Sequence, residues 1–344
     1  MRRRCTRCQT VYEGDARFCP RDGNPLVDVE GGAPAKKSGG NDPEVSGTLV
    51  RAAVKRAQGQ MSNNAATLKD QIIDGRYQVL RRLGEGGMAY VYLARELSTG
   101  TSVAVKVLTP KLLADNTALQ RLRREAGLAM RLNHPNVCNI LRLGETEGGL
   151  IYLVMPYLNG ELLSEREAKV GPMSLEVAIP FLTQMCDGLH HAHGFNIVHR
   201  DLKPENVMIV MDGDSEFAVV MDFGLAKARG SAAMKKLTAT GIVLGTPEFM
   251  SPEQVRGKDI DARSDVYSVA ILAFEMFTGK LPFEGRSAQE MMIARLRGTP
   301  TPLSKHRPDL PPQLEKVLNK AMEVDPDARH ATAKDFGAAL AGLL

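Results

Sequence analysis

The chain has 344 residues, 43% of them hydrophobic, so it can bury a large core and is expected to form one two-lobed domain with an appendage. Its net charge of +4, with 24% charged residues, neither demands nor excludes a nucleic-acid partner. No apolar run approaches the roughly 20 residues of a membrane span, and the Met1–Cys5 start is followed by no apolar signal core, so the sequence predicts a cytoplasmic protein.

The first cysteines have the spacing of metal ligands. Cys5 and Cys8 form one short knuckle, and Cys19 and Asp22 form a second with the same spacing. A tight turn in each knuckle can point its first and fourth residues at one ion, so these four residues are candidate Zn²⁺ ligands. Residues 1–26 resemble the small zinc ribbons at the ends of many bacterial proteins, except that Asp22 stands where a fourth cysteine is expected.

Two alternatives stay open for this segment: a ribbon that binds no metal, and a redox-sensitive cluster of thiols. Nucleic acid could contact Arg2, Arg3, Arg4 and Arg7. Arginines beside a knuckle more often form a solvated face, so nucleic acid is not an expected partner.

Residues 27–74 have the composition of a flexible linker, rich in glycine and small polar residues. From Tyr77 the pattern becomes β-rich and predicts a strand, a glycine-rich turn and a returning strand. Glycine has no Cβ, so backbone N–H groups in such a turn can approach phosphates. The turn and its flanks contain Leu83, Gly84, Glu85, Gly86, Gly87, Met88, Ala89 and Val91.

The next segment, Val103–Val107, is a buried-strand pattern interrupted by one cation, Lys106. The apolar spacing of Leu119–Arg131 predicts a helix, on which Glu125 is the candidate partner of Lys106. A core strand is predicted at Leu150–Met155, and residues 156–160 follow as a connection between the lobes.

Beyond this connection the apolar period becomes helical. Residues 174–193 predict a long buried helix with Ser174 at its N-cap. His190, His191 and His193 near its end could suggest a metal site, but we interpret them as surface residues favoured by the helix C-terminal dipole. Cys138 and Cys186 fall in apolar surroundings and are expected to be buried thiols.

The run Ile197–Asn206 combines an acid, Asp201, with Lys203 and Asn206, between apolar flanks that predict short strands. A second acid, Asp222, follows the apolar run 218–221 and precedes a Phe-Gly turn. Two acids and an amide that converge at strand ends would suit a magnesium ion carrying phosphates, with one carboxylate left over for a hydroxyl.

These two motifs resemble the catalytic loop and the metal-binding turn of protein kinases. The resemblance to the eukaryotic-like serine/threonine kinases of bacteria covers residues 77–344. It implies an α+β, two-lobed kinase fold after the zinc-ribbon-like module and its linker. The expected parts are a kinase domain at 75–344, with a β-rich N-lobe at 75–155, a hinge at 156–160 and a helical C-lobe at 161–344.

The resemblance also implies the activity: transfer of the γ-phosphoryl group of ATP, with Mg²⁺ or Mn²⁺, to serine and threonine hydroxyls of proteins. The implied catalytic residues are Asp201, Lys203, Lys106 and Glu125, and the implied metal ligands are Asn206 and Asp222. The implied nucleotide contacts are the residues of the glycine-rich turn together with Ala104, Met155, Pro156, Leu158 and Met208.

Three positions depart from the family pattern. Ala89 stands at the third glycine, which predicts a slightly stiffer loop. Pro156 replaces the glutamate of many relatives, but the expected hydrogen bond to adenine uses its carbonyl, which proline keeps. Ser251 replaces the usual alanine of the segment that closes the activation loop, where Glu253 is expected to pair with Arg329.

Regulation is predicted from the same resemblance. Arg200 stands where family members bind a phosphate on the activation loop, and Thr238 and Thr240 stand where bacterial relatives carry that phosphate. If one copy of the chain phosphorylates the activation loop of another, two copies must form a dimer, so dimerisation is also expected.

Two rival functions remain. A pseudokinase scaffold usually lacks one of the six catalytic positions, and all six are filled here. A zinc-ribbon nucleic-acid binder is disfavoured by the near-neutral charge of the long domain.

Overall fold

The chain forms two compact units in the computed structural model, Met1–Val50 and Arg51–Leu344. The described residues are 2–5, 11–13, 26–28, 65–86, 89–109, 116–223, 247–283, 285 and 287–344. Among them, no helix combines the length and the apolarity that a bilayer-spanning segment needs.

The first unit contains a small antiparallel sheet with the strand order β2-β1-β3. Its strands are β1 (Arg2–Cys5), β2 (Val11–Glu13) and β3 (Leu26–Asp28). Cys5 ends β1 opposite Leu26. The other predicted zinc ligands, Cys8, Cys19 and Asp22, lie outside the described residues, so the zinc site stays a prediction.

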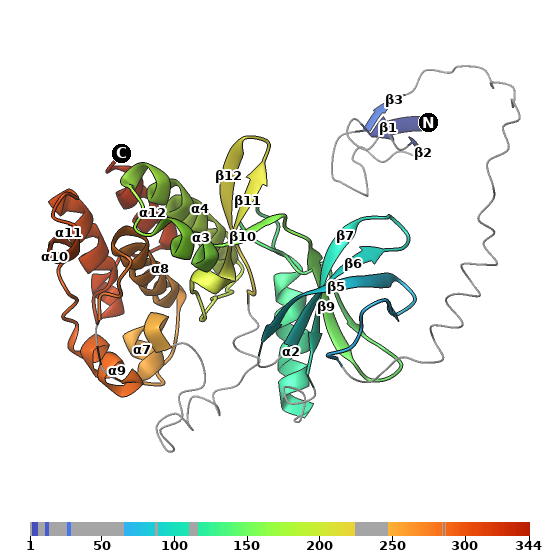
Figure 1. Ribbon diagram of the computed structural model, residues 1–344, viewed down its shortest axis with the longest axis horizontal. Helices are drawn as coiled ribbons and strands as arrows, with labels where there is room; N and C mark the ends of the chain where they lie inside the picture. The colour runs from blue at the N-terminus through green and yellow to red at the C-terminus, as the bar shows by residue number, and fades with distance from the viewer. Residues whose placement is uncertain are drawn as a thin grey trace, which may run out of the picture. The chain divides into compact units, whose positions relative to one another are not determined.

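The second unit contains a six-stranded antiparallel sheet of order β4-β5-β6-β7-β9-β8. Strands β5, β6, β7 and β9 of this sheet are labelled in Figure 1. The strands are β4 (Ile72–Ile73), β5 (Tyr77–Gly86), β6 (Ala89–Glu96), β7 (Ser102–Leu108), β8 (Arg142–Glu145) and β9 (Ile151–Pro156). Helix α2 (Asn116–Ala129) packs on this sheet through Leu122 and Ala126, which share an apolar cluster with Ile151 and Leu153. Sheet and helix form the predicted β-rich lobe.

Residues 65–74, assigned to the linker in the sequence analysis, are packed against this sheet. Ala65, Leu68 and Ile73 are buried in the apolar cluster of the strands. The Tyr92 hydroxyl donates a hydrogen bond to the carbonyl of Ala65 at 2.6 Å, and strand β4 pairs with β5. The β-rich lobe therefore extends about ten residues N-terminal to the predicted boundary at 75.

The second lobe is mainly helical. Within the described residues its helices are α3 (Leu163–Val170), α4 (Leu175–Gly194), α7 (Pro252–Val255), α8 (Ala262–Thr278), α9 (Ala288–Arg297), α10 (Leu303–His306), α11 (Pro312–Ala321) and α12 (Ala333–Ala341). Short 3₁₀ turns lie at η2 (Pro204–Asn206), η3 (Pro247–Phe249) and η4 (Pro326–Ala328). Helix α4 matches the predicted long buried helix, with Ser174 at its N-cap.

Helix α8 lies at the centre of this lobe. It is apolar on nearly all sides, as expected for a helix surrounded by protein, and its residues from Ser264 to Phe274 are all buried. The Asp261 side chain caps its first turn by accepting from the N–H of Arg263. Gly279 ends it with φ +66°, a left-handed conformation that glycine adopts without steric cost.

A three-stranded antiparallel sheet, β10-β11-β12, lies where the two lobes join. Its strands are β10 (Gly160–Leu162), β11 (Val207–Asp212) and β12 (Ser215–Val220). The hairpin of β11 and β12 places Asn206 before one strand and Asp222 after the other. The strand predicted at Ile197–Val198 is absent: this segment is irregular, and the N–H of Ile197 donates instead to the carbonyl of Ala192 in the last turn of α4 at 3.1 Å.

Candidate active site

An ion pair joins the two lobes. Nζ of Lys106, on β7, lies 2.6 Å from Oδ2 of Asp222, two residues beyond the end of β12. Lys106 stands opposite Val91 on β6 and Leu153 on β9, so it emerges from the middle of the sheet. Asp222 has φ +62°, which turns its backbone sharply after the strand. The sheet and the hairpin thus bring together two residues that are 116 positions apart.

The loop between the buried helix α4 and strand β11 brings Asp201 close to Asn206. The side-chain amide of Asn206 donates a hydrogen bond to the backbone carbonyl of Asp201 at 2.6 Å. The N–H of Met221 donates to the carbonyl of Asn206 at 2.8 Å. Asn206 therefore lies between the loop residue Asp201 and the turn that contains Asp222.

Asp265, on α8, holds the backbone of this loop. Its carboxylate accepts hydrogen bonds from the N–H groups of His199 at 2.8 Å and Arg200 at 2.9 Å. Burial raises the pKa of this carboxyl, but the hydrogen bond from His193 and the nearby imidazoles outweigh burial, so its pKa lies below the ordinary value. The backbone of Arg200 has φ +70°, an uncommon conformation for a non-glycine residue that these bonds stabilise.

The interpretation of His193 as a surface residue is wrong. Its side chain is only 8% exposed, and Nε2 donates to the Asp265 carboxylate at 2.7 Å. The prediction from the helix dipole failed because the end of α4 faces α8 rather than solvent. His193 thereby orients the carboxylate that holds the loop.

His199 is a second residue to which sequence reasoning gave no role. Its Nε2 donates to the carbonyl of Met221 at 2.7 Å, and its Nδ1 accepts from the N–H of Asp201 at 3.3 Å. The ring also contacts the edge of Phe223. One imidazole thus connects the loop containing Asp201 to the turn containing Asp222. Its position two residues before Asp201 is the feature of the sequence from which this role could have been predicted.

The predicted adenine contacts meet in one apolar cluster between the lobes. Ala104 and Met155 are buried there, and Val91, Leu158 and Met208 are partly buried against them. Cys138 belongs to the same cluster and, like Cys186, is a buried free thiol, as predicted. Burial raises the pKa of the Cys138 thiol to about 12. Pro156 ends strand β9 next to this cluster.

The glycine-rich turn joins β5 and β6. Gly84 lies opposite Val91, and Gly86 opposite Ala89. A Cβ at Gly84 would meet no atom within 4 Å, and one at Gly86 would meet only the carbonyl oxygen of Ala89 at 3.9 Å. The backbone here is therefore accessible to a phosphate-bearing ligand. Leu83 and Glu85 lie on β5, whereas Gly87 and Met88 fall outside the described residues.

Glu125 is buried on α2, with 7% of its surface exposed. Its predicted pairing with Lys106 stays a prediction. Lys203 precedes the turn η2 in the same loop as Asp201.

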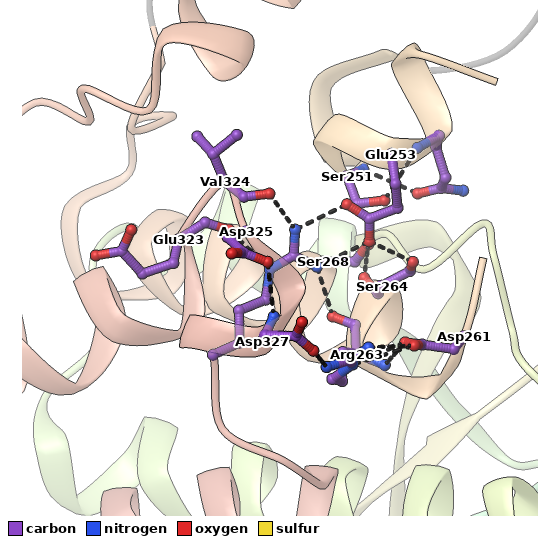
Figure 2. A network of polar contacts seen from close by, with 12 residues as sticks. Ser251, Glu253, Asp261, Arg263, Ser264, Ser268, Glu323, Val324, Asp325 and Asp327 are labelled. Atoms are coloured by element: carbon purple, nitrogen blue, oxygen red, sulfur yellow. Dashed lines mark hydrogen bonds and ion pairs between the residues drawn. The ribbon is translucent and has the colours of Figure 1, made fainter. Parts of the chain in front are cut away.

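A buried ion pair closes the segment after the activation loop, as predicted. Both terminal nitrogens of Arg329 donate to the carboxylate of Glu253 at 2.8 Å, and Figure 2 shows the surrounding network of Ser264, Ser268 and Arg263. Burial raises the pKa of Glu253, but hydrogen bonds from Arg329 and Ser264 outweigh it and leave that pKa below its ordinary value.

The predicted switch residues are only partly described. Thr238 and Thr240 lie outside the described residues. The Arg200 side chain is partly buried, and within the described part of the chain no carboxylate lies at ion-pair distance from its guanidinium. Gln254 donates from its amide to the Arg200 carbonyl at 2.7 Å.

Comparison with known proteins agrees with this geometry. The family model described as the protein kinase domain matches residues 77–337. The chain is 39% identical over 269 residues to serine/threonine-protein kinase pkn3 of Myxococcus xanthus, covering 77% of this chain and 49% of that protein. It is 40% identical over 266 residues to serine/threonine-protein kinase PrkC of Bacillus subtilis, covering 77% of this chain and 40% of that protein.

Among solved structures, the kinase domain of Mycobacterium tuberculosis PknI is similar, with a TM-score of 0.64 and 26% sequence identity, covering 80% of this chain and 98% of that one. The chain spans half or less of the length of the two curated relatives. From the family match over residues 77–337 and the two-lobed fold, the chain belongs to the protein kinase domain family.

Proposed function

We propose that this chain is a serine/threonine protein kinase that transfers the γ-phosphoryl group of ATP to hydroxyl groups of protein substrates. The observation that carries the proposal is the convergence of Lys106, Asp201, Asn206 and Asp222 where the lobes join. These are the groups that phosphoryl transfer requires: a cation for the phosphates, oxygen ligands for magnesium and a carboxylate for the attacking hydroxyl.

Each residue has a role in this reaction. Lys106 would bind the α- and β-phosphates, and the glycine-rich turn would cover them with its backbone N–H groups. The amide oxygen of Asn206 and the carboxylate of Asp222 suit Mg²⁺, which prefers oxygen ligands and when bound neutralises charge on the phosphates. The apolar cluster around Ala104 and Met155 would receive the adenine ring.

The chemical step uses the remaining carboxylate. The substrate oxygen forms a bond to the γ-phosphorus while the bond from that phosphorus to the bridging oxygen of ATP breaks, and ADP leaves. Asp201 orients the hydroxyl and accepts its proton, and Lys203 stabilises negative charge on the transferred group. Glu125 would orient Lys106.

Regulation is part of the proposal. A phosphate on Thr238 or Thr240 would add about two negative charges and three strong acceptors, enough to order the activation loop through the guanidinium of Arg200. Two copies of the chain would phosphorylate each other at these threonines in a transient dimer. ATP is produced in the cytoplasm, and we place the kinase domain there.

The N-terminal module would bind one zinc ion. Three thiolates and a carboxylate, from Cys5, Cys8, Cys19 and Asp22, form a donor set that Zn²⁺ accepts. The short strands β1 to β3 support a ribbon. Because residues 1–50 form a compact unit of their own, the module is expected to act in docking or targeting rather than in catalysis.

The test is direct. Purified protein is incubated with Mg-ATP labelled at the γ-position and a generic protein substrate, and the labelled amino acids are identified after hydrolysis. We expect phosphoserine and phosphothreonine. Label on tyrosine alone, or no label on the substrate, would contradict the proposal.

A further inference from the structure

One arginine in helix α9 is fully buried. Arg295 has 0% of its surface exposed, although it lies in the last turn of a helix with an exposed basic neighbour, Arg297. Burying a guanidinium is costly unless its charge and its donors are satisfied. Burial accordingly lowers the pKa of Arg295, against the opposing effects of Tyr267 and Glu248. Hydrogen bonds and contacts of the guanidinium must therefore offset the free-energy cost of burying Arg295.

That contact is with the segment after the activation loop. The guanidinium of Arg295 donates a hydrogen bond to the backbone carbonyl of Glu248, in the turn η3. Its Cζ also lies 5.9 Å from the centroid of the Phe283 ring. Helix α9 packs against both η3 and α7, so Arg295 lies in an interface between α9 and this segment.

The Phe283 ring continues into a column of stacked groups. It is stacked on Tyr267 with an interplanar angle of 8° and centroids 6.4 Å apart. On Tyr267 lies the second cation, Arg329, whose Cζ is 4.9 Å from the ring centroid. Each of the two stacked rings therefore has an arginine over it, an arrangement favourable for both cations.

The two arginines hold opposite ends of the same segment. Arg295 binds the carbonyl of Glu248, and Arg329 binds the carboxylate of Glu253 through two hydrogen bonds of 2.8 Å. Between these points Ser268 donates to the carbonyl of Phe249 at 2.9 Å. The close view in Figure 2 shows Ser251, Glu253, Ser264 and Ser268 close to one another, and Arg329 is bonded to Glu253 of this group.

The segment is also tied to the catalytic loop. Gln254 donates its amide hydrogen to the carbonyl of Arg200, the residue before Asp201. Residues 247–250 lead directly into the run that contains Gln254, so a shift of these residues would be passed to the backbone that Gln254 holds beside Asp201, where a peptide must lie to present its hydroxyl. Small misplacements of such surfaces have large effects on reactions between two bound partners.

We propose that Arg295 is a positioning residue for the peptide substrate: by holding the Glu248 carbonyl it fixes residues 247–250 for peptide binding. This inference rests on the proposed kinase function. It assigns to helix α9 a part in substrate recognition that is separate from the ion pair of Glu253 and Arg329. Arg295 acts through the backbone of the segment and touches neither ATP nor the reacting atoms.

The test compares Arg295→Leu, Arg295→Lys and the matched control Arg297→Leu, which removes an exposed arginine from the same turn. For each full-length protein, kcat and KM are measured separately for a peptide substrate and for ATP, and thermal melting reports folding. We expect Arg295→Leu to raise the KM for the peptide about tenfold, as for loss of a charged hydrogen bond, with the KM for ATP within about twofold of the wild type. Arg295→Lys keeps one charged donor and should restore part of the peptide affinity, and Arg297→Leu should match the wild type.

A merely structural role would lower kcat through a smaller folded fraction and leave both KM values unchanged. That result, or an equal rise of both KM values, would overturn the inference. If Arg295→Leu does not fold, Arg295→Lys decides, and a wild-type KM for the peptide in that variant overturns it. Wild-type protein that transfers no phosphate would overturn the proposed function and this inference together, whereas active wild-type protein with an unchanged peptide KM in the variants overturns only the inference.

Discussion

Oδ1 of Asp265 lies 2.9 Å from the backbone nitrogen of Arg200, the residue before Asp201. The carboxylate is fully buried and reaches the loop from α8, the most buried helix of the lobe. The position of the proposed catalytic carboxylate therefore depends on a hydrogen bond from the core rather than on the loop alone.

We predict that Asp265→Asn lowers kinase activity at least tenfold and unfolding free energy by about 1.5–3 kcal/mol. Hydrogen bonds to a charged acceptor contribute this much, and a neutral amide cannot accept equally from His193, His199 and Arg200. Activity assays and thermal melts would be compared with Asp259→Asn, at an exposed aspartate. An Asp265→Asn protein with wild-type activity would show that this anchor is dispensable.

A pH dependence is expected from Glu167. Burial, together with the like charges of Glu275 and Glu205, raises its pKa to about 8. The folded chain therefore favours the protonated carboxyl. The contribution of Glu167 to the unfolding free energy is therefore fully present below its unfolded pKa of about 4.5. It decreases as the pH rises from there through the folded pKa of about 8.

Glu167→Gln removes the ionisation and should raise stability at pH 8 by about 1 kcal/mol after allowance for solvent screening, or roughly 2–4 °C in Tm. The gain should disappear near pH 5. Thermal melts across this range check it, with Glu147→Gln as the exposed control. A gain that is the same at both pH values would mean that the charge of Glu167 is not the cause.

The activation-loop switch makes a separate prediction. Incubation with Mg-ATP should add phosphate at Thr238, Thr240 or both, and should raise activity because Arg200 would then bind the phosphate. Peptide mapping identifies the sites. Activity toward an outside substrate should fall in the double variant Thr238→Ala, Thr240→Ala, and full activity there would reject the switch while leaving the kinase assignment intact.

The N-terminal module is predicted to bind one zinc ion per chain, independently of catalysis. Metal analysis of purified protein should find it, and the double variant Cys5→Ser, Cys8→Ser should lose zinc but keep kinase activity. The buried Cys138 and Cys186 serve as internal controls, since native protein should protect them from alkylation. Zinc-free protein whose Cys5 and Cys8 react freely would refute the site.

Much of the fold and the candidate site could be predicted because the motif residues act through fixed local spacing. Asp201, Asn206 and Asp222 lie beside a single β-hairpin, whose strands were visible as apolar runs. The β-rich lobe was likewise predicted from the strand pattern around Lys106. At these positions the local sequence pattern was enough to predict where the residues lie in the fold.

The misses have the opposite character. His193 is a polar residue near a helix end, where local sequence predicts exposure, and the packing of α4 against α8 buries its side chain. Residues 65–74 were assigned to the linker because residues 27–74 as a whole are rich in glycine and small polar residues, the composition of a flexible linker. Their burial depends on the whole surface of the sheet, which no short window of sequence shows.

The central claim is that phosphoryl transfer depends on Asp201 and Lys106. The measurement is the rate of transfer from Mg-ATP to a protein substrate by wild type, Asp201→Asn and Lys106→Met, with circular dichroism to show that all three are folded. We predict that each variant loses at least two orders of magnitude in rate, since a lost electrostatic contact in the transition state costs roughly 3–4 kcal/mol. Folded Asp201→Asn protein that transfers phosphate at close to the wild-type rate would contradict the account.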